Sequence, residues 1–479
     1  MAALTKSATL MVLLAPALLS GCATMAPRYE RPEAPVAEKL PYTEEGAVDT
    51  GGLLSWREVF PDPKLQSLIE LAIDNNRDLA VATLNVERAR ALYRVQRSES
   101  LPSITASGAY SRQRYGENAS TGFASSSATG ASAPFTIERY SASANVSAYE
   151  LDLFGRVRSL NRQALETYFA TDEARKTAEI SLVAEVANAY LQLAADRELL
   201  QIAKDTVTSQ SEAMTLTTQL ADKGLGNELD VQRARTTVES ARADAAQLEA
   251  QVALDENALQ LLLGVPALPE LDGKRGIENI AILKDVPVGL RSEVLLGRPD
   301  ILEAEHKLKA ANANIGAARA AFFPRIQLTA SAGTSSAELK NLFAAGTGVW
   351  SFAPSIDVPI FTGGKNLAQL SGARIDRKIA QKQYEKAIET AFREVADALA
   401  TRSTIKARIE ANENLADAAA KTYELSDARF RSGVDDYLSV LTAQQADYSA
   451  RRQLVAARLV EAANLVSFYR ALGGDAPAR

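Results

Sequence analysis

The sequence has one cysteine, Cys22, and one histidine, His306, among its 479 residues. With a single cysteine the chain forms no internal disulfide. A single histidine excludes a histidine zinc cluster and a Ser-His-Asp triad, so His306 is interpreted as a structural or solvated helix residue. Ser403 and Lys406 have the spacing of a Ser/Lys nucleophile motif, but they lie within a helical pattern and lack its companion motifs. The sequence therefore predicts no enzymatic activity, no metal and no bound cofactor.

Basic residues are not in excess either. The formal net charge is −6 at pH 7, and charges of both signs are interspersed along the chain. This balance argues against nucleic acid as a partner. Length alone would allow about three ordinary domains, but the helical patterns in this chain are too long for that number.

Glycine and proline are absent from a stretch of 68 residues, Arg156–Lys223, which lies between Gly155 and Gly224. As one helix it would be about 100 Å long, which is more than a globular domain can enclose. Its apolar residues recur at helical or heptad spacing with charged residues between them. The pattern predicts a coiled-coil stave, as shown by Ile180, Val183, Ala187, Tyr190, Leu191 and Ala194.

The glycines of this region recur 209 residues later. Gly224 and Gly264 match Gly433 and Gly473, and a second long interval without proline lies before Gly433, although Gly372 interrupts it. Two copies of about 200 residues predict two similar halves packed side by side rather than a solenoid of short repeats. The expected fold is mixed α+β, with an internal two-fold repeat.

These patterns divide the chain into a leader, an arm and two repeats joined by a connector. Each repeat is expected to contain a half-length helix, two strands, a long helix and a second half-length helix. The expected ranges are a leader at 1–21, an arm at 22–62, repeat one at 63–264, a small mixed equatorial connector at 265–297, repeat two at 298–474 and a tail at 475–479. In repeat one, the first helix is expected from Lys64 to about Glu99, the strands at about 101–112 and 138–150, and the later helices at 156–223 and 227–263. In repeat two, the strands are expected at about 324–334 and 349–359, and the later helices at 365–432 and 435–472.

The first 22 residues predict a lipoprotein signal. The apolar run Ala8–Leu19 is too short to span a bilayer as a permanent helix, and it leads into Leu19-Ser20-Gly21-Cys22. A chance cysteine behind an ordinary signal peptide is the alternative. Because a bacterial lipobox requires cysteine at this place and the chain has no other, the pattern favours lipid attachment at Cys22. Ala23 follows, and in bacterial lipoproteins a residue other than Asp there favours the outer membrane.

Four segments alternate apolar and polar residues with a period of two, and they come as two pairs. One face of each is apolar and the other is small and polar, and a loop rich in Gly, Ser and Ala joins each pair, at 116–132 and 333–348. This is typical of a transmembrane β-barrel, with a soluble sandwich as the alternative. Four strands cannot close a barrel around a lumen, and lipid does not tolerate an open sheet edge. Several chains are therefore expected to pool their strands.

Motifs throughout the mature chain resemble the TolC-like outer membrane factor family, and they are most similar to its OprM/NodT branch of outer membrane efflux lipoproteins. The resemblance covers nearly all of the mature chain. The motifs are Trp56, Phe60, Asp62-Pro63, Asn75-Asn76, Asp78-Leu79, Glu150-Leu151-Asp152-Leu153-Phe154-Gly155-Arg156, Arg298-Pro299-Asp300-Ile301, Ala310-Ala311-Asn312-Ala313, Ala320-Ala321-Phe322-Phe323-Pro324, Pro359-Ile360-Phe361-Thr362-Gly363-Gly364, Gly433-Val434-Asp435-Asp436-Tyr437-Leu438 and Ala471-Leu472-Gly473-Gly474.

The resemblance implies a homotrimer in the outer membrane, with a twelve-stranded barrel continued by a long periplasmic α-barrel. Members of the family have no catalytic site. They are the passive exit ducts of tripartite systems, in which a periplasmic adaptor joins the duct to an inner-membrane pump, commonly of the resistance-nodulation-division class. Small molecules such as drugs and toxic compounds are the expected cargo.

The two helical turns are the expected tips of the duct. Leu225 beside Gly224 and Val434 beside Gly433 are exposed aliphatic residues at small turns, which suits docking of an adaptor hairpin; helix-capping glycines with a covering side chain are the alternative. For closure of the resting tip, the resemblance implies charged and apolar gate residues. These are Asp230, Arg429 and Leu438. Relatives often have Asp and Arg where this chain has Thr442 and Gln445. Closure is therefore expected to depend more on Leu438.

Two other functions fit parts of the pattern. A type I secretion duct would have the same fold and export polypeptides, but the lipobox and the OprM-like motifs argue against it. A periplasmic coiled-coil adaptor lipoprotein would have no membrane strands, and the alternating segments contradict it.

Overall fold

The structure is a computed structural model that describes residues 24–42, 55–116, 134–271, 276–280 and 292–474. The leader, Cys22 and the tail lie outside these ranges. The chain divides into two compact units. The strand unit contains Met1–Arg31, Arg88–Tyr168 and His306–Ala380, and the hairpin unit contains Pro32–Glu87, Phe169–Glu305 and Gln381–Arg479.

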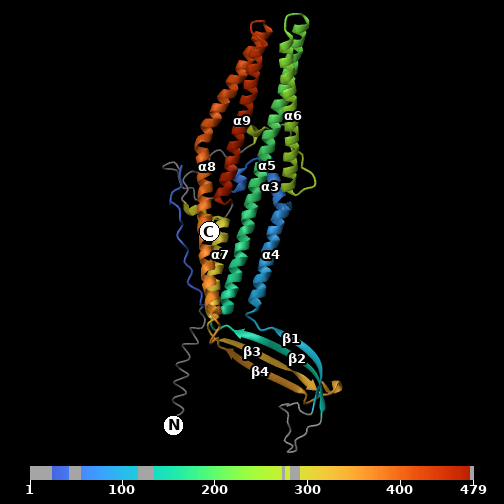
Figure 1. Cartoon of the computed structure of the whole chain (residues 1–479), viewed down its shortest axis with the longest axis vertical. Coiled ribbons are helices and arrows are strands. Elements are labelled where there is room, and N and C mark those ends of the chain that lie inside the picture. Colours follow the sequence, from blue (N-terminus) through green and yellow to red (C-terminus); the bar gives the residue numbers. More distant parts are fainter. Residues whose placement is uncertain (1–23, 43–54, 117–133, 272–275, 281–291, 475–479) are drawn as a thin grey trace, which may run out of the picture. The chain divides into compact units, whose positions relative to one another are not determined.

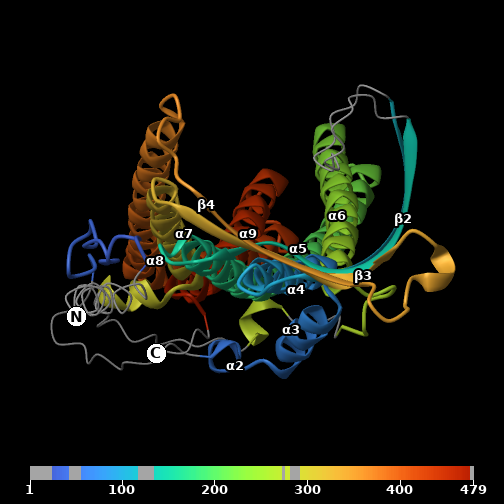
Figure 2. The same ribbon diagram turned by 90° about the horizontal axis from the view of Figure 1, so that it is seen from below.

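The strand unit contains one antiparallel sheet in the order β1-β2-β3-β4. The sequence pattern separates the strands into two pairs, and the structure joins these pairs because β2 also hydrogen-bonds to β3. Both repeats therefore contribute to one curved sheet, whose described edges are β1 and β4 (Figure 1, Figure 2). The strands are Ile104–Tyr115 (β1), Phe135–Leu151 (β2), Arg325–Ser336 (β3) and Gly348–Asp357 (β4).

The longest strand, β2, has 17 residues and begins before the expected residue 138. Its register against β3 shifts between Val146 and Tyr149, and Ala148 has a φ of 47°. This is a β-bulge, which bends the strand and moves the residues beyond it to the opposite face. Strict alternation in the sequence therefore describes β2 only up to Val146.

The two longest helices, α5 (Arg156–Asp222) and α8 (Lys365–Arg431), have 67 residues each, which corresponds to about 100 Å of helical rise. Short turns lead from them into α6 (Glu228–Leu263) and α9 (Tyr437–Leu472), of 36 residues each. Figure 1 shows α5 with α6, and α8 with α9, as two antiparallel hairpins. The shorter α7 (Pro299–Ala320) precedes β3.

The first half-length helix, expected as one element from Lys64 to about Glu99, is broken into α3 (Pro63–Asn75) and α4 (Arg77–Ser98). Asn76 at the break has extended backbone angles. Its Oδ1 accepts the Leu79 N–H at 3.0 Å, which caps α4. Its Nδ2 donates to the Leu262 carbonyl of α6 at 2.9 Å. The break is compensated because one side chain satisfies backbone groups of two helices.

The core of the hairpin unit lies where α3 meets the ends of the hairpins. Leu65 and Ile69 of α3 are fully buried, and the ring of Phe60 meets that of Tyr469 edge-on at 5.7 Å. Phe60 follows the short helix α2 (Trp56–Val59). Within its described residues the connector contains the 3₁₀ helices η2 (Ile277–Asn279) and η3 (Ser292–Gly297). Among the described helices, none combines the length and the apolar character needed to cross a bilayer.

Candidate functional site

The tips of the two hairpins are built alike. Gly224 and Gly433 have φ angles of +74° and +71°, a left-handed conformation that favours glycine. In both turns the next residue donates its N–H to a carbonyl five residues earlier, Leu225 to Leu220 and Val434 to Arg429, each at 2.9 Å. This closure is a Schellman motif. It leaves the side chains of Leu225 and Val434 76% and 63% exposed.

The predicted gate residue Asp230 forms its contacts within the α5–α6 tip. Its backbone N–H donates to Oδ1 of Asn227 at 2.9 Å, and its own Oδ2 accepts from Asn227 Nδ2 at 2.8 Å. Arg233, one turn further along α6, forms an ion pair with Asp230 at 3.2 Å. Asp230 therefore stabilises the start of α6, where a carboxylate also favours the helix dipole.

Arg429 and Leu438 lie at the other tip. Arg429 donates two hydrogen bonds to Asp435, at 2.6 and 2.8 Å, and these bonds lower the pKa of Asp435. Leu438 lies in the first turn of α9 and is 45% exposed. Within the chain, the structure thus places Arg429 and Leu438 at one tip and Asp230 at the other. Sequence reasoning missed Asp435, although the motif from Gly433 to Leu438 contains it.

The exposed stripe that begins at Leu438 continues along α9 without charge. Thr442 and Gln445 follow at helical spacing and are both exposed, and the Thr442 hydroxyl donates to the Leu438 carbonyl at 2.8 Å. A threonine bonded to its own helix presents a methyl group and no charge. Leu438 is therefore the bulky apolar residue of this stripe at the tip.

A small apolar cluster joins the two hairpins close to their tips. Tyr437 of α9 is buried against Ala234 of α6, and its ring lies 5.7 Å from that of Phe430. Met214 of α5 packs against the same cluster. Tyr437 was not predicted as a tip residue, although it stands in the motif beside Leu438.

One face of the sheet is polar and carries no charge in its middle rows. Thr105, Asn145, Ser331 and Ser351 lie opposite one another across the four strands. Asn145 Nδ2 donates to the Ser107 hydroxyl at 2.9 Å, and the hydroxyls of Ser331 and Ser351 are 2.7 Å apart. The polar groups of this face thus bond to one another, and the face is lined with hydroxyl and amide groups.

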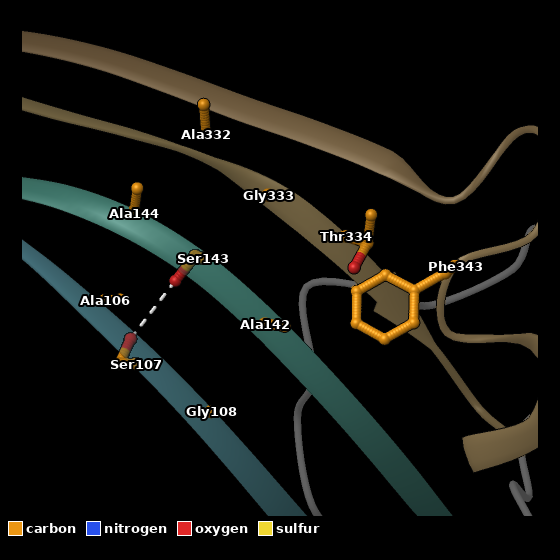
Figure 3. A pocket seen from close by; sticks show the side chains of 10 residues that line it. All are labelled: Ala106, Ser107, Gly108, Ala142, Ser143, Ala144, Ala332, Gly333, Thr334 and Phe343. Carbon is orange, nitrogen blue, oxygen red and sulfur yellow. Dashed lines mark hydrogen bonds between the residues drawn. The ribbon is translucent and has the colours of Figure 1, made fainter.

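A hollow of about 430 Å³ lies over the small residues of β1, β2 and β3 (Figure 3). Gly333 is required here, because a Cβ on it would lie 2.1 Å from the Ala142 carbonyl oxygen. Ser107 and Ser143 are hydrogen-bonded across β1 and β2, and Phe343 reaches the hollow from the segment between β3 and β4 (Figure 3). The small residues let the strands approach and bend, which a closed barrel requires.

Residues 24–42 contain the first described part of the arm, and Met25 to Tyr29 lie along α7. Asn312 Nδ2 donates to the Pro27 carbonyl at 2.8 Å, and Arg319 donates to the Met25 carbonyl at 3.0 Å. Gly316 lies between them, and a Cβ there would be 2.7 Å from the Ala26 nitrogen. This face of α7 is shaped for the arm, whose first described residue is Thr24.

His306 has the structural role expected from the sequence. Its Nδ1 lies 2.7 Å from Oε2 of Glu166, a buried residue of α5. Burial of Glu166 acts to raise its pKa. The hydrogen bond from His306 and the charge of Arg162 have a larger combined effect in the opposite direction, so the pKa of Glu166 is lowered. The pair ties α5 to α7. In the part of the chain that the structure describes, no three His, Cys, Asp or Glu side chains converge to hold a metal ion.

The chain matches known proteins along nearly its whole length. The sequence model of the family described as outer membrane efflux protein matches residues 68–265 and 290–474. The toluene efflux pump outer membrane protein TtgC of Pseudomonas putida is 45% identical over 465 residues, which are 95% of this chain and 93% of that protein.

Solved structures agree with this match. A membrane protein from Pseudomonas aeruginosa superimposes with a TM-score of 0.86 at 41% identity, over 94% of this chain and 98% of that one. The MtrE outer membrane channel of Neisseria gonorrhoeae, solved in its open state, superimposes with a TM-score of 0.84 at 38% identity, over 95% of this chain and 98% of that one.

Proposed function

The chain belongs to the outer membrane efflux protein family, as its motifs predicted, and we propose that it is the outer-membrane exit duct of a tripartite efflux system. It passively conducts small molecules that an inner-membrane pump delivers through a periplasmic adaptor. The observation that carries the proposal is the family match over both repeats, in a chain that has a sheet and two hairpins with 67-residue helices.

Three copies are proposed to pool their strands into a twelve-stranded barrel, continued by twelve helical staves. Within one chain β1 and β4 are the described sheet edges, and every residue of β4 is exposed. Open edges are not tolerated in lipid. The helix α4 buries only Leu79, and neighbouring copies would cover its exposed apolar side chains. These are Val81, Leu84, Leu92 and Val95.

The cargo is inferred to be small apolar or amphipathic compounds, because the relative TtgC is named for toluene efflux. The pump is proposed to be of the resistance-nodulation-division class. Cells that lack this protein but keep its pump should accumulate toluene and lose tolerance to it, and returning the protein should restore both. Unchanged accumulation would contradict the proposed role.

Adaptor docking is proposed at Gly224, Leu225, Gly433 and Val434. The proposal is supported by the matching turns at the two tips and by the exposed side chains of Leu225 and Val434. Replacing Leu225 and Val434 together with aspartate should weaken adaptor binding, because the apolar contact is lost and charge must be desolvated. The matched control replaces both with methionine and should keep binding. An equal loss of adaptor binding in both double variants would show that the shape of the two side chains, and not their apolar character, decides.

Gate closure is proposed to depend on Leu438, with Asp230 and Arg429 supporting the two tips. Leu438→Asp would set three like charges near one another in the trimer, and their repulsion should splay the tips and raise single-channel conductance in planar bilayers. Leu438→Asn is the matched control, because it removes the apolar side chain without adding charge. Unchanged conductance in a correctly assembled Leu438→Asp trimer would place the constriction elsewhere.

Lipid attachment is proposed at Cys22. The arm contacts on α7 support it, because they hold the chain that follows this residue. Cys22→Ser should abolish incorporation of labelled fatty acid and leave the leader uncleaved. Incorporation into the mutant protein would place the lipid on another residue.

A further inference from the structure

The connector between the repeats is bound by both hairpins. On one side, the Ile277 N–H donates to Oε2 of Glu198 in α5 at 2.9 Å. Gly276 permits this approach, because a Cβ there would lie 2.5 Å from the same oxygen. The side chains of Ile277 and Ile280 are buried. The described connector residues 276–280 are therefore anchored to α5 through a backbone hydrogen bond.

On the other side, Arg458 of α9 holds the connector by charge. Its NH1 donates to Glu278 at 2.6 Å, and its NH2 donates to Glu413 of α8 at 3.3 Å. Arg458 is largely buried, whereas the two carboxylates are about half exposed. One guanidinium thus links the connector to both helices of the α8–α9 hairpin.

Comparison with the first repeat shows that the link to the connector is an addition. The positions 209 residues before Glu413 and Arg458 are Lys204 and Glu249, and these two also form an ion pair, at 2.8 Å. The pair has reversed charges and joins α5 to α6 only. Both hairpins therefore carry an internal ion pair at this level, and among the described residues only the pair of the second hairpin is also bonded to a connector carboxylate.

The anchor points lie at the same level of the two hairpins. Glu198 precedes Gly224 by 26 residues and Arg458 follows Gly433 by 25, which places both about 38 Å of helical rise from their tips. Between this level and the tips, the hairpins meet through polar contacts, such as that from Gln444 to Ser209 at 2.9 Å, and through the apolar cluster around Tyr437. A restraint at this level limits how far the tips can separate.

We propose that Glu278 and Arg458 are positioning residues of the duct, which clamp the two hairpins through the connector and hold the tips together. This inference rests on the proposed function. When the ion pair opens, the α8–α9 hairpin loses its charged link to the connector while its own pair with Glu413 persists. The tips then separate more readily, although no residue at the tips has changed.

Single-channel recording in planar bilayers tests the clamp. An ion pair of this kind shifts a two-state equilibrium by a factor of about two to five, so Glu278→Gln should raise the open probability by about that factor. Glu413→Gln and Glu249→Gln are matched controls, because each breaks a pair within one hairpin. Both should record like the unmodified protein. An equal rise in either control, or no rise in Glu278→Gln, would overturn the clamp.

Crosslinking supplies the reverse test. With Glu278→Cys and Arg458→Cys together, the duct should open more often, and a short bis-maleimide that joins the two cysteines should return it to the unmodified level. The control pair Glu413→Cys and Arg458→Cys also loses Arg458, but joining α8 to α9 should not restore closure. If crosslinking the control pair also returned the open probability to the unmodified level, the effect would come from stiffening of the α8–α9 hairpin and not from the connector. Failure to form channels in any protein, including the unmodified one, would instead contradict the proposed function.

Discussion

The two repeats fix the ends of their last helices with different chemistry. In the first repeat, Asn76 donates to the Leu262 carbonyl at the end of α6, at 2.9 Å. In the second, Arg298 takes the corresponding place and donates to the Ala471 carbonyl at the end of α9. Leu262 and Ala471 are 209 residues apart, as are the glycines of the two repeats. The same backbone contact is thus made once by a neutral amide and once by a buried cation.

The cation brings more of the fold together. Arg298 also donates to Asp300 at 2.7 Å and to Glu394 of α8 at 2.9 Å, and its side chain is almost fully buried. A neutral hydrogen bond contributes about 1 kcal/mol net, whereas removing one partner of a buried ion pair leaves uncompensated charge and costs about 3–5 kcal/mol. Both repeats therefore have the hydrogen bond to the carbonyl at the end of the last helix, and its loss costs more free energy of unfolding in the second repeat.

The largest expected effect is that of Arg298→Met. It should lower the free energy of unfolding in urea by about 3–5 kcal/mol, because Glu394 and Asp300 lose their buried partner. Arg298→Lys should recover part of this loss, since it keeps the charge but not the fork of donors. A loss no larger than that of Asn76→Ala would remove the proposed difference between the repeats.

Next in size is Gly264→Ala, for which we expect a loss of about 3 kcal/mol. Gly264 has a φ of +65°, and a Cβ would lie 2.4 Å from the Asn75 carbonyl oxygen, which is backbone. Gly473→Ala is the matched variant. Its Cβ would lie 2.9 Å from Arg298 Cγ and 3.2 Å from Arg298 Cα, which is a less severe overlap, so it should cost about half as much in the same titration. The reverse order would show that the side chain of Arg298 is the more rigid neighbour.

Asn76→Ala should cost about 1–2 kcal/mol, because it removes one helix cap and one neutral hydrogen bond. Urea titration measures this loss, and Asn76→Asp separates the two contacts, since aspartate keeps the acceptor for Leu79 but not the donor for Leu262. If Asn76→Asp is as stable as the unmodified protein, the contact with Leu262 contributes little and the comparison of the repeats rests on Arg298 alone.

The smallest effect concerns a carboxyl pair that only the first repeat has. Burial, with the neighbouring Asp196 carboxyl, raises the pKa of Asp255 to about 6. The positions 209 residues later are Ile405 and Asn464. In the fold Asp255 holds a proton more tightly than in the unfolded chain, so its contribution to stability is full below about pH 4 and is lost as the pH rises through about 6.

Asp255→Asn should therefore stabilise the protein at pH 8 and leave stability at pH 3.5 unchanged. Because Asp255 is partly exposed and water screens the pair, the gain at pH 8 should be about 1 kcal/mol. Urea titrations at the two pH values measure it. A variant whose stability changes equally at both pH values would contradict a role for ionisation.

The sequence predicts what is periodic and misses what depends on contact between distant segments. Glycine spacing indicates the duplication, the long helices and the two tips, because left-handed turns require glycine. The break at Asn76 was missed because the apolar pattern continues through it, although Asn75-Asn76 followed by Asp78 is a capping signal. The bond from Arg298 to Ala471 joins residues 173 positions apart, and no local pattern shows it.

Three copies of the chain are proposed to close their sheets and hairpins into one duct. Native mass measurement of the mature protein in mild detergent tests it most directly, since each chain presents two open sheet edges among its described strands. We expect a mass of three chains. A single chain that is stable in detergent and still forms conducting channels in a bilayer would contradict it.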